Sequence, residues 1–365
     1  MISLLVLTAA GCGHRPPAPE PYKAFVVNKG NSTLAVADLA KLRVVASIPV
    51  GQQPERVRAR PNSHQLYVVS ADGRINVVGY PELRVVNTIE VGRSARDLAF
   101  SPDGRRAYVL DPVDNQIVFL DCASGRRTET VHVRDPLTGL ALTPDGKTLI
   151  GASRAANLLV FISAETRKML GSVEVGKAPG CMVILPNSSK VFVVDMKEDV
   201  ISAADVSSQQ LLSNIEIGTR PTGLVLKPDG GEVFVLSADA ATLTIVDAFH
   251  DNVEQTFPTG RDPVAGVFRR DSSVLYIANA GDGSILALDV QNRTVLATVP
   301  VGTAPQSLAL TPDERFLAVA DPGTSSLAIL WADPATLSKG RSALITSIPI
   351  GADPVDVTIP NWLTK

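Results

Sequence analysis

The chain has 365 residues and a nearly balanced charge, with 34 Lys and Arg against 37 Asp and Glu and a formal net charge of −3. This balance argues against the basic surface that a nucleic-acid-binding protein needs, so no nucleic-acid partner is predicted. Hydrophobic residues make up 45% of the chain and charged residues only 19%, which allows a large buried core.

The start of the chain is predicted to be a processed signal followed by a tether. Residues 2–10 form an apolar run, too short to span a bilayer, that ends in small residues before Cys12. It resembles a bacterial lipoprotein signal, which implies that residues 1–11 are removed and Cys12 is lipidated. The alternative is an ordinary cleaved or buried segment. The proline-rich residues 12–21 are predicted to form an extended tether.

From residue 22 onward one unit recurs with a period near 42 residues. We call the first residue of each unit its head. The head is a glycine in every unit except one, where Arg134 holds the position. The glycine heads are Gly51, Gly92, Gly176, Gly218, Gly260, Gly302 and Gly351. A period of this length is typical of repeat proteins, so the chain from residue 22 to residue 365 is predicted to form one domain.

Each unit is predicted to contain four strands joined by tight turns. A short apolar run such as residues 139–142 follows the head and ends in a turn such as the Pro-Asp-Gly of residues 144–146. Proline sets the backbone angle of that turn, aspartate bonds its own backbone, and glycine accepts a left-handed conformation. Second, third and fourth apolar strands lead back to the next head. Four short strands per repeat are typical of a propeller blade.

The two ends of the chain are predicted to complete one blade together. Residues 22–50 supply only the second, third and fourth strands of a unit, and residues 351–360 supply only a first strand. Seven complete units lie between them, so joining the ends gives eight blades. The predicted fold is therefore all-β: an eight-bladed propeller of four-stranded antiparallel blades, closed without open sheet edges.

Two segments carry a family resemblance. Residues 301–321, VGTAPQSLALTPDERFLAVAD, and the similar residues 140–153 resemble the YVTN-type β-propeller repeats of surface-layer and periplasmic proteins. The resemblance covers about residues 22–360. Many members of that family have seven blades, which makes seven the alternative count. Its members include structural surface proteins, lactonase-like propellers and redox-associated propellers, so the resemblance does not select a function.

Charged residues occupy first-strand positions in three adjacent predicted blades. Asp356, Arg56 and Asp97 hold one equivalent position, five residues after the head, and Ser307 holds it in the preceding unit. The residues directly before two of these positions are Glu55 and Arg96. We expect this set at the mouth of the central channel. One interpretation is a structural ion-pair patch. The other is a docking site for an anionic or sugar-like ligand, with the two arginines as forked donors.

Acidic residues also recur between the predicted second and third strands. They are Asp72, Asp111, Asp114, Asp195, Asp199, Asp239, Asp282 and Asp321. Such carboxylates could bind a divalent cation, but no calcium-loop spacing is present, and turn formation on solvated loops is the alternative. The four histidines lack motif partners, and neither a Gly-x-Ser-x-Gly elbow nor a Cys-x-x-Cys-His haem motif occurs. No catalytic residue, metal ligand or cofactor is therefore predicted.

The sequence predicts an exported propeller, anchored by lipid alone to the periplasmic face of the outer membrane. It is expected to bind an envelope protein or a small ligand without catalysis. Two alternatives stay open: a lactonase-like, metal-assisted hydrolase and a periplasmic redox-associated accessory propeller. Cys122 and Cys181 fall in different units and are predicted to be free thiols rather than a disulfide.

Overall fold

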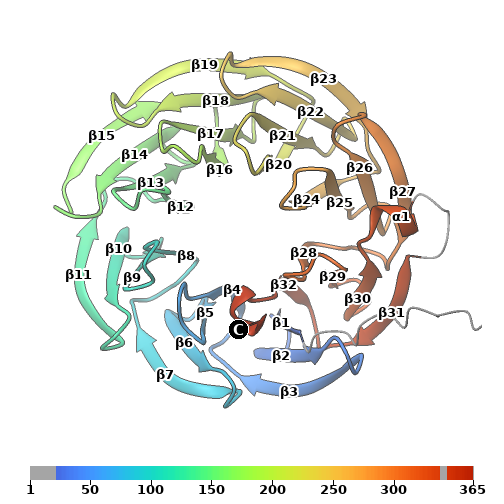
Figure 1. Ribbon diagram of the computed structural model, residues 1–365. Coiled ribbons are helices and arrows are strands. Elements are labelled where there is room, and N and C mark those ends of the chain that lie inside the picture. Colours follow the sequence, from blue (N-terminus) through green and yellow to red (C-terminus); the bar gives the residue numbers. More distant parts are fainter. Residues whose placement is uncertain (1–21, 338–342, 365) are drawn as a thin grey trace, which may run out of the picture.

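A computed structural model describes residues 22–337 and 343–364 as a closed ring of eight four-stranded antiparallel sheets (Figure 1). The eight-bladed propeller predicted from the sequence is confirmed, and the seven-blade alternative is wrong. The signal segment, Cys12 and the tether lie outside the described residues.

Every blade has the same strand order from the channel to the rim. The inner strands line the channel: β4 (Pro54–Ala59), β8 (Asp97–Phe100), β12 (Gly139–Leu142), β16 (Pro179–Ile184), β20 (Pro221–Leu226), β24 (Pro263–Phe268), β28 (Ser307–Leu310) and β32 (Pro354–Thr358). The second strands follow: β1 (Lys23–Asn28), β5 (Gln65–Ser70), β9 (Arg106–Asp111), β13 (Thr148–Ser153), β17 (Lys190–Asp195), β21 (Glu232–Ser237), β25 (Val274–Asn279) and β29 (Phe316–Asp321).

The remaining two strands of each blade lie toward the rim. The third strands are β2 (Thr33–Asp38), β6 (Arg74–Gly79), β10 (Gln116–Asp121), β14 (Leu158–Ser163), β18 (Val200–Asp205), β22 (Thr242–Asp247), β26 (Ser284–Asp289) and β30 (Ser326–Trp331). The outer strands are β3 (Arg43–Pro49), β7 (Arg84–Glu90), β11 (Arg126–His132), β15 (Met169–Glu174), β19 (Gln210–Glu216), β23 (Asn252–Pro258), β27 (Thr294–Pro300) and β31 (Leu344–Pro349).

The core is divided among the blade interfaces. The described residues form eight buried hydrophobic clusters, and each is shared by two neighbouring blades. Second and third strands such as β5 and β6 are buried along almost their whole length because a blade covers each of their faces. The outer strand β3 instead alternates between exposed and covered residues. The repeat thus stabilises the ring through nearest-neighbour packing.

The ring closes by pairing the two ends of the described chain. β32 lies antiparallel to β1, with Val26 opposite Val357, and β2 and β3 complete this closing blade. Every inner strand therefore has a second strand beside it. The closure predicted from the two partial units is confirmed.

Aspartates at the ends of third strands form turns by bonding the backbone that follows them. The Oδ1 atom of Asp205 accepts hydrogen bonds from the backbone N–H groups of Ser207 and Ser208 at 2.9 and 2.8 Å. Asp38 and Asp247 accept two backbone N–H groups in the same way. These carboxylates are therefore part of the turns.

Two short helices complete the described chain. α1 (Pro334–Leu337) lies between β30 and β31, and the 3-10 turn η1 (Asn361–Thr364) follows β32. Among the described residues, no helix has both the length and the apolarity needed to cross a bilayer.

Candidate functional site

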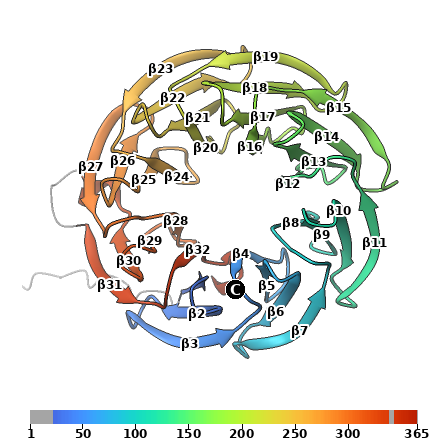
Figure 2. The same cartoon turned by 180° about the vertical axis from the view of Figure 1, so that it is seen from behind.

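The charged residues of the inner strands are confined to one side of the ring. Glu55 and Arg56 lie on β4, Asp97 begins β8, and Asp356 lies on β32, so three neighbouring inner strands hold the charged residues (Figure 2). The inner strands β12, β16, β20, β24 and β28 contain no charged residue. The channel wall therefore has a charged arc around β32, β4 and β8 and an uncharged arc opposite it.

Asp356 joins the inner strands of three blades. Its Oδ2 atom accepts hydrogen bonds from the backbone N–H of Val57 and from Nη1 of Arg58, both at 2.9 Å. Its Oδ1 atom accepts one from Oγ of Ser307 at 3.2 Å. Asp356 is buried. The structure thus pairs Asp356 with Arg58 rather than with Arg56. Arg58 is a site residue that the sequence analysis did not name. The missed signal was the spacing of two between these arginines, which places them on one face of β4.

The equivalent first-strand position links adjacent blades elsewhere too. Ser307 Oγ accepts a hydrogen bond from the backbone N–H of Val357 at 3.2 Å, and Asp97 Oδ2 accepts one from that of Leu140 at 3.3 Å. Each acceptor belongs to one blade and each donor to the inner strand of the next. Asp97 and Ser307 therefore help to hold neighbouring blades in register, which supports a structural role for these two predicted site residues.

This linkage changes between β4 and β8. The position that holds an acceptor in the closing blade is occupied on β4 by Arg56, and a guanidinium has no acceptor atom. The backbone N–H of Leu98 donates instead to Oδ1 of Asp97 at 2.9 Å. The carboxylate of Asp97 thereby accepts from two backbone N–H groups, those of Leu98 and Leu140. The side chain of Arg56 takes no part in this linkage between blades.

Two predicted site arginines keep unused donors at the mouth. In residues 22–337 and 343–364, the side chains of Arg56 and Arg96 make no hydrogen bond or ion pair, and both residues are exposed. The carboxylates beside them are engaged, since Glu55 lies 3.4 Å from Nζ of Lys29 and Asp97 and Asp356 hold the donors described above. A cavity of about 240 Å³ opens beside Arg56, lined by Lys29, Glu55, Arg56, Gln306 and Val355.

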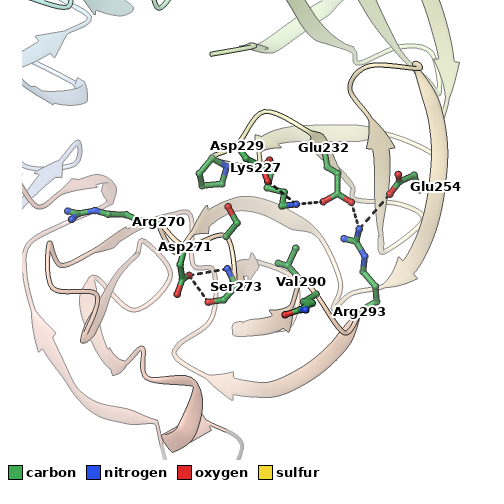
Figure 3. A pocket seen from close by; sticks show the side chains of 12 residues that line it. Lys227, Asp229, Glu232, Glu254, Arg270, Asp271, Ser273, Val290 and Arg293 are labelled. Carbon is green, nitrogen blue, oxygen red and sulfur yellow. Dashed lines mark hydrogen bonds and ion pairs between the residues drawn. The ribbon is translucent and has the colours of Figure 1, made fainter. Parts of the chain in front are cut away.

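A larger cavity of about 700 Å³ lies between the blade of β20–β23 and the blade of β24–β27 (Figure 3). Glu232, only 8% exposed, contacts Arg293 and lies 3.0 Å from Nζ of Lys227. Burial acts to raise the pKa of Glu232, but these two cations hold it below its usual value. Arg293 also lies 3.6 Å from Glu254, whose pKa is raised by burial and by the nearby Glu232. These charges neutralise one another, so we interpret the cluster as a structural network between blades.

A ring of buried polar residues lies beneath the loops at the mouth. Each member is the last residue of a second strand, and each is 0% exposed: Asn28, Ser70, Asp111, Ser153, Asp195, Ser237, Asn279 and Asp321. The expectation that Asp111, Asp195 and Asp321 sit on solvated loops is therefore wrong, because neighbouring blades cover both faces of these strands. The recurrence of polar residues at the repeat spacing was the signal that could have revealed the ring.

Members of this ring hold the backbone of the head loops. Asp321 accepts hydrogen bonds from the backbone N–H groups of Thr303 and Ala304 at 2.7 and 3.1 Å. Asp195 instead accepts from the hydroxyl of Ser202 at 2.7 Å, and burial raises its pKa to about 6. Throughout the described residues, no group of three or more His, Cys, Asp or Glu is placed to hold a metal ion. Asp321 thus acts as a backbone acceptor, whereas Asp195 binds a side-chain hydroxyl.

The two described cysteines are free, as predicted. Cys122 is buried, and burial raises the pKa of its thiol. Cys181 lies on the inner strand β16 and is exposed, although its position in the repeat suggested a mostly buried thiol. Inner strands border the channel, and a side chain there stays accessible even though it is close to the axis of the ring.

Comparison with known proteins rests on structure. No protein-family model matches the chain, and no curated protein matches it. The dihydro-heme d1 dehydrogenase NirN, in complex with DHE, aligns with a TM-score of 0.79 and 15% identity over 96% of this chain and 78% of that one. Hydrazine synthase of Kuenenia stuttgartiensis aligns with a TM-score of 0.61 and 17% identity over 78% and 99% of the two chains.

A functionally unknown protein from Desulfotomaculum acetoxidans also aligns, with a TM-score of 0.63 and 14% identity over 81% of this chain and 99% of that one. At such low identities these similarities show the propeller fold and no more. The resemblance to YVTN-type repeats is consistent with that fold, while membership of the family stays a prediction.

Proposed function

We propose that this propeller is a non-enzymatic binding module that takes a small anionic ligand at the charged arc of its channel mouth. The observation that carries the proposal is that the acidic side chains there have hydrogen-bond partners, whereas two arginine side chains have none among the described residues. The carboxylates of Glu55, Asp97 and Asp356 are occupied, whereas the guanidinium groups of Arg56 and Arg96 have no partner among the described residues. Forked guanidinium donors suit carboxylate and phosphate groups.

The setting that we propose for this module is the cell envelope. The apolar run of residues 2–10 and Cys12 support an exported lipoprotein on the periplasmic face of the outer membrane. Mass spectrometry of Cys12 after expression in a lipoprotein-processing bacterium tests this part. An unmodified chain that still carries residues 1–11 would overturn the anchor without affecting the ligand site.

Calorimetric titration tests the ligand site. The probes are phosphate, sulfate, succinate and citrate, at low and moderate salt. We expect at least one of them to bind, and the variants Arg56→Gln and Arg96→Gln to weaken it about tenfold or more, because a hydrogen bond to a charged group contributes about 1.5–3 kcal/mol. Arg105→Gln is the control, since Arg105 is exposed and pairs with Asp103 in the turn after β8. Equal affinities for all three variants would contradict the proposal.

A tetrapyrrole is the second candidate ligand, in line with a redox-associated role. The observation that favours it is the alignment of 96% of this chain with a dihydro-heme d1 dehydrogenase in complex with DHE. None of the eight inner strands carries a histidine, and Cys181 and Met182 are the sulfur-containing residues on them. The described residues would therefore contact carboxylate groups of the ring through Arg56 and Arg96. Titration with iron protoporphyrin IX tests this candidate, and an unshifted Soret band would exclude this probe as a ligand.

A further inference from the structure

A third cavity lies where the ring closes, at the opposite end of the inner strands from the mouth. In complete blades a hairpin joins the inner strand to the second strand, and neighbouring hairpins pack closely. A Cβ atom added to Gly104 would lie 2.2 Å from the backbone oxygen of Pro61, and one added to Gly230 would lie 2.7 Å from Cδ of Pro186. In the closing blade β32 and β1 come from opposite ends of the chain, so no hairpin joins them there.

The turn η1 occupies the place of that missing hairpin. It sets the ring of Trp362 against the hairpin between β4 and β5, with the centroid of His64 at 5.0 Å, and against Tyr80, with a centroid distance of 5.2 Å. Trp362 also packs into the hydrophobic cluster between the closing blade and the next one. A cavity of about 550 Å³ lies between η1 and this hairpin, lined by Asn62, Ser63, His64, Asn361 and Trp362.

The chemistry of this cavity differs from that of the mouth. The described residues that line it include no carboxylate, lysine or arginine, and they combine two amides and a hydroxyl with two aromatic rings. Amides and hydroxyls both donate and accept hydrogen bonds. Trp362 is 8% exposed, and its buried Nε1–H has no acceptor among the described residues. The cavity therefore sets two amides and a hydroxyl beside the rings of His64 and Trp362.

We propose that this seam cavity binds a neutral saccharide. A sugar ring presents C–H groups on its faces, which suit aromatic rings, and hydroxyls on its edge, which both donate and accept hydrogen bonds. The volume lies in the range of small-ligand pockets, about 300–1,000 Å³. The lining residues that the structure describes include no carboxylate, lysine or arginine to pair with a charged ligand. The site is independent of the anion site proposed at the mouth.

Tryptophan fluorescence of the full chain tests the proposal. The chain contains two tryptophans, and Trp331 packs on Phe316 on another blade, so Trp331→Phe leaves Trp362 as the reporter. The probes are maltose, cellobiose and N,N′-diacetylchitobiose, with glucuronate as the charged comparison. We expect a saturable change in emission with at least one neutral disaccharide and protection of Trp362 from acrylamide quenching.

Variants at exposed residues of the hairpin make the result specific. In the Trp331→Phe background, Asn62→Gly and His64→Ala are expected to weaken binding at least fivefold, while Arg105→Gln leaves it unchanged. Glycine replaces Asn62 because residue 62 has a φ of 54°, which glycine adopts without strain. Both residues are exposed, so their loss is compatible with folding, which circular dichroism checks. The proposal is overturned if no neutral disaccharide changes the emission, if glucuronate alone binds, or if the two hairpin variants bind as the parent does.

Discussion

Asp356 on the last strand of the chain and Arg58 on the fourth strand form an ion pair of 2.9 Å across the seam of the ring. The same carboxylate accepts the backbone N–H of Val57. We expect Asp356→Ala to lower the free energy of unfolding by about 2–3 kcal/mol, because Val57, Arg58 and Ser307 lose a buried acceptor. Urea unfolding measures this. The control is Asp239→Ala, whose carboxylate is 62% exposed, and a loss as small as that of the control would contradict the role of Asp356.

Removal of the last inner strand tests the closure. A chain that ends at Ala352 lacks β32, which exposes the edge of β1 and removes one side of the buried cluster around Val26 and Val357. We expect a much lower melting temperature and increased dye binding to exposed apolar surface. A chain that ends at Trp362 is the control and should melt like the full chain. Equal melting of both truncated chains would refute closure by β32.

Equivalent aspartates of the buried ring are expected to respond in opposite ways to loss of charge. Burial raises the pKa of Asp195 to about 6 from a reference of 3.8, so the folded chain binds this proton more tightly than the unfolded chain. The contribution of Asp195 therefore becomes less favourable as pH rises from about 4 to about 6. Asp195→Asn should raise the free energy of unfolding at pH 7 by about 1–3 kcal/mol and flatten its pH dependence in that window.

The matched comparison is Asp111→Asn. Asp111 accepts hydrogen bonds from the backbone N–H groups of Val113 and Asp114 at 3.0 and 3.1 Å and from the side chain of Gln116 at 3.0 Å. An amide offers one acceptor oxygen in place of two, so this variant should lose about 1–3 kcal/mol at pH 7. Denaturant unfolding between pH 4 and pH 8 measures both variants. Destabilisation of both to the same extent would show that the partners of Asp195 were misjudged.

In the charged network of Glu232 and Glu254, loss of the buried Glu232 is expected to destabilise the fold more than loss of Glu254. Glu232→Ala leaves Arg293 and Lys227 without their shared carboxylate and should cost about 3–5 kcal/mol of unfolding free energy. Glu254→Ala should cost less than about 1 kcal/mol, because the Glu254 side chain is 38% exposed and lies 3.6 Å from Arg293. Thermal melting of the two variants measures the difference. Similar costs would mean that the network does not depend on burial.

Most of the fold could be predicted because its signals are local. The glycine heads and the Pro-Asp-Gly turns recur at a fixed spacing, and the two partial units at the chain ends account for the closing blade that pairs β32 with β1. The third-strand aspartates were predictable for the same reason, since Asp205 bonds the backbone only two and three residues away. Period, blade count and turn chemistry each depend on residues close together in the chain.

The partners of the site residues could not be predicted in this way. Asp356 and Arg58 are separated by 298 positions, and whether Asp356 meets Arg56 or Arg58 depends on the register between two blades. Asp111 and Asp195 hold one position in the repeat but differ in the donors around them, which only the packing of neighbouring loops decides.

The sequence by itself therefore determined the repeat, the eight blades and their closure, because backbone geometry and strand pairing follow from local residue types. The tertiary structure alone decided which charges at the mouth are satisfied, which aspartates are buried, and that a cavity remains beside Trp362. These features depend on side chains that meet across blade interfaces, where a shift of one residue exchanges the two faces of a strand.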